Sequence, residues 1–234
     1  RLRNALWALT WFPVFASISF GQNALVTLVL FCLAYYLWTA DRPLAAGLVA
    51  SLALYKPQLL LGIGVIWLFD FRRSWRALLG LAIGGASLAL LSFTLFPEAS
   101  WAYVDFAGSV LPDLPNWEEF PIWHLHTVRG FWRLLLPWWP GVGDFLTAAA
   151  AVLGLIAVVR LRHTMRSYRR LAFGVAVVLS LWLTPHAMIY DLALLLIPAM
   201  ILWHELPGWR DRWRPLYALV WLVTLISGPL TYLQ

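Results

Sequence analysis

Nine apolar segments, separated by polar turns and by one long stretch, make up most of the 234-residue chain. Lipid supplies no water to unpaired backbone groups, so apolar runs of this kind cross a membrane as helices. Several runs are shorter than the ~20 residues of a straight crossing, which indicates half-helices or extension by flanking residues. The sequence therefore predicts an all-α, polytopic membrane helix bundle. Its segments are residues 5–20, 23–39, 43–55, 58–71, 77–96, 144–159, 171–184, 186–203 and 216–233.

The composition supports a membrane protein and argues against a soluble class. Hydrophobic residues make up 62% of the chain and charged residues 12%, and 16 tryptophans are spread along it, as in interfacial aromatic belts. The single cysteine, Cys32, excludes a disulfide framework and a cysteine-based zinc site. The net charge of +6 comes from basic residues in the turns between membrane segments, so we expect no nucleic acid partner. Residues 1–234 form one integral-membrane domain.

Basic residues alternate between the turns. Fourteen of the 17 fall in every second turn, and only Lys56, Arg129 and Arg133 fall in the other set. By the positive-inside rule, the arginine-rich turns are cytoplasmic. They hold Arg1, Arg3, Arg42, Arg72, Arg73, Arg76, Arg160, Arg162, Arg166, Arg169, Arg170, Arg210, Arg212 and Arg214.

The same alternation gathers the unusual polar residues on the outer face, where we expect the functional site. The four outer turns are Gly21-Gln22-Asn23, Lys56-Pro57-Gln58, the stretch 97–143, and the stretch 184–191.

Lys56, the only lysine, lies inside a long apolar run. A lysine at bilayer depth costs roughly 2.5–3.5 kcal/mol on insertion scales, so such residues usually face a cavity and a partner. We expect Lys56 to meet a ligand; the alternative is a side chain that extends to the interface as an anchor.

An anionic ligand is expected at this face. Four predicted helices begin there, near Asn23, Pro57, Asp144 and Pro185, and each N-terminus carries a partial charge of roughly +0.5. A lipid-linked phosphate at the outer leaflet fits this charge and depth. Two other readings stay open: Gln22 and Asn23 could form only a helix cap, and His186 could be an ordinary turn histidine. Asp191 is expected to line the same cavity as His186, because a carboxylate that faces lipid is costly.

The outer stretch 97–143 is long enough to carry function. Its tryptophans fit either an interfacial belt or, for one or two of them, sugar stacking, and an amphipathic helix is expected around 128–136. They are Trp101, Trp117, Trp123, Trp132, Trp138 and Trp139.

No metal site and no cofactor are expected. His124 and His126, with Glu118 and Glu119 nearby, lack the spacing that fixes a complete ligand set. The chain has neither a phosphate-cradling glycine loop nor a dinucleotide fingerprint. The pairs Gly62/Gly64 and Gly84/Gly85 lie in membrane segments, where small residues let helices approach closely.

Taken together, the motifs resemble glycosyltransferase family 87. They are Gly21-Gln22-Asn23, Lys56-Pro57-Gln58, the aromatic outer stretch, Pro185-His186 and Tyr190-Asp191. The family comprises polytopic GT-C-type enzymes related to mycobacterial polyprenol-phosphate-mannose-dependent mannosyltransferases. The resemblance runs from about Arg3 to about Trp203.

The resemblance implies transfer of a sugar, mannose, from a polyprenyl-phosphate donor to a lipid or glycan acceptor at the outer face of a bacterial plasma membrane. His186 and Asp191 would be catalytic, with Asp191 orienting His186 or the sugar. The donor would be bound by Lys56, Gln58, Gln22, Asn23 and Arg129.

GT-C enzymes usually take their general base from the first external loop. No such loop precedes residue 1, and the chain starts without methionine or a signal pattern, so we expect an N-terminally truncated chain that lacks the base.

Two other classes remain open from the residues alone. A transporter or flippase for an anionic lipid would use the same outer-facing cation, although no internal repeat supports it. A non-catalytic membrane subunit is the other alternative.

Overall fold

The computed structural model describes residues 8–110 and 122–230, and these residues are helical without β-strands. The all-α prediction is confirmed. In chain order the elements are α2 Phe12–Ser19, α3 Ala24–Thr39, α4 Pro43–Ser51, η1 Pro57–Leu60, α5 Leu61–Phe69, α6 Phe71–Leu95, α7 Pro97–Asp105, η2 Phe106–Val110, η4 Ile122–His124, α8 Val128–Leu135, α9 Pro140–Ser167, α10 Arg169–Leu183, η5 Ile189–Leu195, α11 Leu196–Glu205, η6 Pro207–Trp209 and α12 Arg210–Leu230.

Every predicted apolar segment overlaps one of these helices, but few of the helices are long enough to cross a membrane alone. In the described part of the chain, α6 and α9 have the necessary length and apolar character. A third crossing is possible if η5–α11 and the helix after it, bent by 103°, form one broken span. The protein is therefore a helical membrane protein, and the count of nine crossings stays a prediction.

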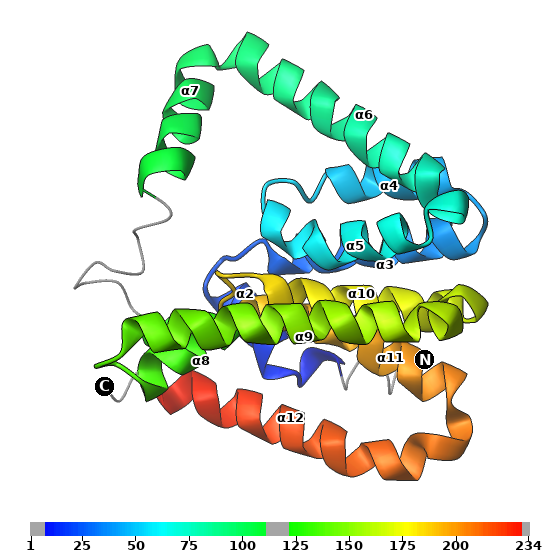
Figure 1. The fold of residues 1–234 in the computed structure, drawn as a ribbon, viewed down its shortest axis with the longest axis vertical. Helices are drawn as coiled ribbons and strands as arrows, with labels where there is room; N and C mark the ends of the chain where they lie inside the picture. The colour runs from blue at the N-terminus through cyan, green and yellow to red at the C-terminus, as the bar shows by residue number, and fades with distance from the viewer. Residues whose placement is uncertain (1–7, 111–121, 231–234) are drawn as a thin grey trace.

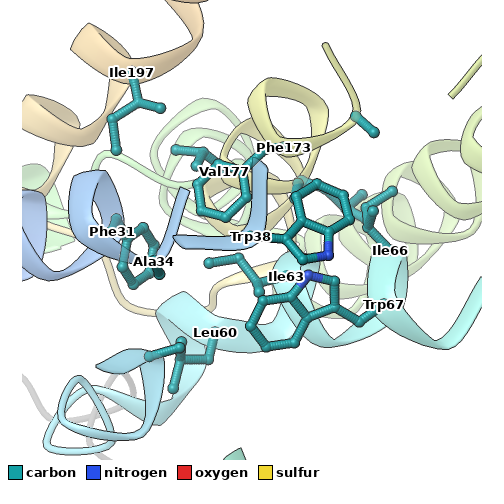
Figure 2. Close-up of a cluster of buried hydrophobic side chains, with 14 of the residues drawn as sticks. Phe31, Ala34, Trp38, Leu60, Ile63, Ile66, Trp67, Phe173, Val177 and Ile197 are labelled. Carbon is teal, nitrogen blue, oxygen red and sulfur yellow. The ribbon is translucent and has the colours of Figure 1, made fainter. Parts of the chain in front are cut away.

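Most of the helices stack side by side (Figure 1), and buried side chains between them form one large and one small apolar cluster. Helices α3, α5, α9 and α10 run roughly parallel, whereas α6 leaves the stack and α7 folds back from its far end. Figure 2 shows rings from three helices meeting in the core: Trp38 of α3, Trp67 of α5 and Phe173 of α10. All three are almost completely buried.

Glycines allow two pairs of helices to approach closely, as predicted for membrane segments. A Cβ added at Gly62 of α5 would lie 2.1 Å from the Ala176 carbonyl oxygen of α10. A Cβ added at Gly84 of α6 would lie 2.0 Å from the Ser51 hydroxyl oxygen of α4. Gly64, by contrast, faces open space. The close-approach prediction thus holds for Gly62 and Gly84 and fails for Gly64.

Several predicted arginine-rich turns meet at one end of the stack. Arg169, at the start of α10, is ion-paired with Asp41, which follows α3. Arg170 binds Glu205 at 2.8 Å, and the Arg73 guanidinium donates to the backbone oxygen of Arg166 at 2.8 Å. Turns that are far apart in sequence are thereby tied together at this end.

One predicted helix start is wrong. The helix expected to begin at Pro185 begins at Ile189, because residues before it are extended: Met188 has a ψ of 170° and forms an isolated bridge with Leu125. Pro57 does occupy the start of η1, as expected.

Candidate functional site

Lys56 and Asp191 form an ion pair at the end of the stack opposite the arginine-rich turns. Lys56 immediately precedes η1, and Asp191 lies in the first turn of η5. The lysine Nζ is 2.6 Å from the Asp191 Oδ1. The lysine side chain is 17% exposed and the aspartate side chain 4%, so the cation is the more accessible member.

Two further contacts hold this pair. The Met188 backbone N–H donates to the other carboxylate oxygen of Asp191 at 3.1 Å, which fixes the aspartate at the start of η5. The Tyr190 ring lies against the ammonium of Lys56, 4.8 Å from the nitrogen to the ring centroid. A carboxylate and an aromatic ring thus hold the Lys56 ammonium in place.

The turn that contains Gln22 and Asn23 adjoins the Lys56 turn. The Tyr55 hydroxyl donates to the Asn23 backbone oxygen at 3.2 Å and pairs with the Thr27 hydroxyl at 2.7 Å. Gly21, at φ 60°, makes the sharp reversal into this turn. The first two predicted outer turns are therefore adjacent in space.

The segment around His126 lies against the turn that carries His186. The His126 backbone N–H donates to the Ala187 carbonyl at 2.8 Å, and Leu125 bridges Met188. With the Lys56–Asp191 pair, these bonds bring parts of all four predicted outer turns to one end of the molecule.

His186 is half-buried beside the cationic face of α8. Burial lowers the pKa of His186, and the positive charge of Arg129 lowers it further. Both effects favour the neutral ring, in which one nitrogen carries an N–H. Such a group suits a hydrogen bond to a phosphate or hydroxyl oxygen.

Arg129 and Arg133, one turn apart on α8, both bind Asp144 near the start of α9. The Arg133 Nη2 lies 2.7 Å from Asp144 Oδ2, and the Arg129 Nε lies 3.3 Å from Oδ1. Thr127 caps α8 by accepting from the Gly130 N–H. The predicted helix at 128–136 is thus present, and Arg129 shares a carboxylate rather than standing alone.

The amides proposed from the sequence have different surroundings. Gln22 donates to the Phe20 carbonyl at 3.2 Å. Asn23 is exposed and Gln58 half-buried, and neither side-chain amide bonds to another residue in the described ranges. Both amides are therefore available to a ligand.

Sequence reasoning missed the roles of Thr27 and Tyr55. Their hydroxyls bond to each other although the two residues are 28 positions apart, and no residue pattern signals such a contact. The contact of the Tyr190 ring with Lys56 was also not predicted, although Tyr190 is next to Asp191. The sequence signal for this contact is that Lys56 and the pair Tyr190-Asp191 both lie in turns predicted at the outer face.

Most of the described tryptophan side chains of the stretch 97–143 lie at the surface. Trp101, Trp138 and Trp139 are exposed, whereas Trp132 is half-buried. Trp117 and the Trp123 side chain lie outside what the structure describes, as do Glu118 and Glu119. The described His, Cys, Asp and Glu residues form no group that could hold a metal.

Comparison with known proteins gives one match. A sequence model of glycosyltransferase family 87 matches residues 2–185, a range that includes Lys56 and ends before His186 and Asp191. No curated protein and no solved structure matches the chain.

Proposed function

This membrane protein belongs to glycosyltransferase family 87, and we propose that it transfers mannose from a polyprenyl-phosphate donor to a lipid or glycan acceptor. We place the reaction at the extracytoplasmic face of a bacterial plasma membrane, with the arginine-rich turns in the cytoplasm. The unequal distribution of basic residues supports this orientation.

The ion pair between Lys56 and Asp191 carries the proposal. A lysine that is partly exposed at the meeting point of several turns, with its counter-ion behind it, can attract an anion from the membrane side. Phosphate is the anionic part of a polyprenyl-linked sugar. Lys56 would therefore bind the donor phosphate by a charge-assisted hydrogen bond.

The proposed chemistry moves a sugar from one oxygen to another. The bond from the sugar's anomeric carbon to the phosphate oxygen breaks, and its electron pair stays on the phosphate. A new bond forms to the acceptor oxygen, whose proton passes to a general base. Because negative charge grows on the departing phosphate, Lys56 and the neutral N–H of His186 would stabilise the transition state.

The neighbouring polar groups would orient the donor. Asn23 and Gln58 have free amides that could bind sugar hydroxyls or phosphate oxygens, with Gln22 beside them. Arg129 adds positive charge next to His186. Both carboxylate oxygens of Asp191 are engaged by Lys56 and Met188, so we assign Asp191 to holding Lys56 and assign the general base to another carboxylate.

A transfer assay on the full-length protein with defined polyprenyl-phosphate sugars tests the function. Lys56→Ala should lower donor use about 10- to 100-fold, since a hydrogen bond to a charged group contributes roughly 1.5–3 kcal/mol. Arg72→Ala, which removes an exposed cation at the opposite end, is the matched control and should retain activity. Wild-type transfer by a folded Lys56→Ala protein would refute the donor site.

His186 can be tested separately by comparing rate and affinity. If its N–H meets the phosphate charge that develops during the reaction, His186→Ala should lower kcat more than it raises the donor KM. An increase in KM alone, with kcat unchanged, would assign His186 to ground-state binding.

A further inference from the structure

We infer that Asp191 competes with phosphate for Lys56, and that this competition releases the spent lipid phosphate after each transfer. The inference rests on the proposed function, because it assumes that Lys56 is the phosphate-binding residue. It differs from a positioning role, in which the aspartate would strengthen phosphate binding.

The geometry gives the two partners unequal freedom. Asp191 is nearly buried and is tied to the Met188 N–H, so its carboxylate cannot follow an incoming ligand. Lys56 carries its ammonium on a flexible four-carbon stem and is the more exposed member. A phosphate can therefore draw Lys56 outward, and the fixed carboxylate can draw it back.

The ammonium has few directions left for a ligand. Of its three N–H groups, one points to Asp191 at 2.6 Å, and the Tyr190 ring covers another side of the nitrogen. A phosphate that binds Lys56 here comes close to the Asp191 carboxylate. Like charges in such proximity repel, so Asp191 weakens every anion that binds Lys56.

This competition matters most for the product. The donor phosphate is a diester with one negative charge, whereas the departing lipid phosphate is a monoester with a charge of about −1.5 to −2 at pH 7. Without a competitor, Lys56 would hold the product more tightly than the donor and would slow turnover. A fixed carboxylate beside Lys56 opposes the more highly charged product more strongly than the donor.

Binding of a sugar-free, short-chain polyprenyl phosphate to the full-length protein in phosphatidylcholine nanodiscs tests the inference directly. Asp191→Asn removes the charge but can still accept from the Met188 N–H, so the turn should persist. We expect this variant to bind the lipid phosphate on the order of 10-fold more tightly than wild type, about 1.4 kcal/mol. In the transfer assay it should show a lower kcat and stronger inhibition by added polyprenyl phosphate.

Asp41→Asn is the matched control, because Asp41 pairs with Arg169 at the opposite end of the stack. Its φ of 57° is tolerated by asparagine, and its affinity for the lipid phosphate should equal that of wild type. If Asp191→Asn does not fold, Asp191→Ser provides the same test, since serine also accepts at a first helical turn.

The outcomes separate the inference from the function on which it rests. Equal or weaker binding by a folded Asp191→Asn protein overturns the competition and assigns Asp191 to positioning Lys56. If Lys56→Met binds the lipid phosphate as wild type does, the proposed donor site itself is wrong, and the inference fails with it.

Discussion

The ammonium of Lys56 lies 2.6 Å from the carboxylate of Asp191, a residue 135 positions later in the chain. The pair joins the start of η1 to the start of η5 and thereby connects the two halves of the helix stack. The Asp191 side chain is nearly buried, whereas the Lys56 side chain is partly exposed. Replacing Lys56 alone therefore leaves an unpaired, buried charge on Asp191, whereas replacing both residues leaves none.

This asymmetry predicts a specific pattern of stabilities. Lys56→Met keeps the apolar stem but leaves Asp191 unpaired, and we expect it to lower the free energy of unfolding by about 2–3 kcal/mol. The double variant Lys56→Met/Asp191→Asn should regain most of this loss, because no buried charge remains. Thermal unfolding in detergent measures both changes.

The matched control for this prediction is an ion pair at the surface. Arg170→Met breaks the pair with Glu205, whose members are 60% and 29% exposed, and should cost no more than about 1 kcal/mol. A double variant less stable than Lys56→Met alone would show that the pair contributes through packing rather than charge.

The sequence could predict that Lys56 has a partner, because an isolated lysine in an apolar run requires one in any fold. The alternation of arginines also predicted which turns would meet at the same end. The partner of Lys56 could not be predicted. Asp191 was expected beside His186, since hydropathy locates a helix in the chain but not its rotation against its neighbours.

The limits of helix prediction have an equally local cause. Proline favours the first position of a helix, which was correct for Pro57 and wrong for Pro185. At Pro185 the backbone stays extended because residues 187 and 188 bond to the segment around His126. That contact depends on residues about 60 positions away, which local pattern cannot reveal.

The glycine contact between α5 and α10 provides a second prediction. In Gly62→Ala the added Cβ would lie 2.1 Å from the Ala176 backbone oxygen, so the two helices must separate. We expect a loss of stability of about 2 kcal/mol or more, within the range for overpacking. Thermal unfolding of the purified variant in detergent gives the measurement.

Gly64→Ala in the same helix is the control, because its Cβ would meet nothing within 4 Å. Alanine is favoured over glycine in helix interiors by roughly 1 kcal/mol, so this variant should be neutral or more stable. Equal loss in both variants would mean that the close approach at Gly62 does not determine stability.

His126 gives the stability a predictable dependence on pH. Its Nδ1 lies 3.0 Å from the His124 carbonyl and its Nε2 lies 3.3 Å from the Ser227 hydroxyl, so the ring contacts two segments of the chain that are far apart in sequence. Burial lowers the pKa of His126 below its usual range. The unfolded chain therefore binds more protons just below the usual histidine pKa, and stability falls as the pH decreases through that window.

His126→Asn should reduce this acid sensitivity, because asparagine does not titrate and can still donate to the His124 carbonyl. The measurement is the difference in Tm between pH 7.5 and pH 5.5. The exposed His163, replaced by Asn, serves as the control and should leave the difference unchanged. An unaltered difference in His126→Asn would assign the acid sensitivity to other groups.

The last prediction concerns the orientation that the proposed function requires. Single cysteines at Ser109 and Ser167 should lie on opposite sides of the membrane, with Ser109 outside, because α9 connects the two predicted faces between them. Both serines are exposed, whereas Ser74 and Thr184 are buried and would not react from either side. Cys32 is exposed on α3 and must first be replaced by serine.

In intact cells an impermeant thiol reagent should then label the cysteine at 109 and not the one at 167, and permeabilisation should expose the second. Labelling of both positions in intact cells would contradict the alternation of the turns, and the donor site near Lys56 would lose its assignment to the outer face.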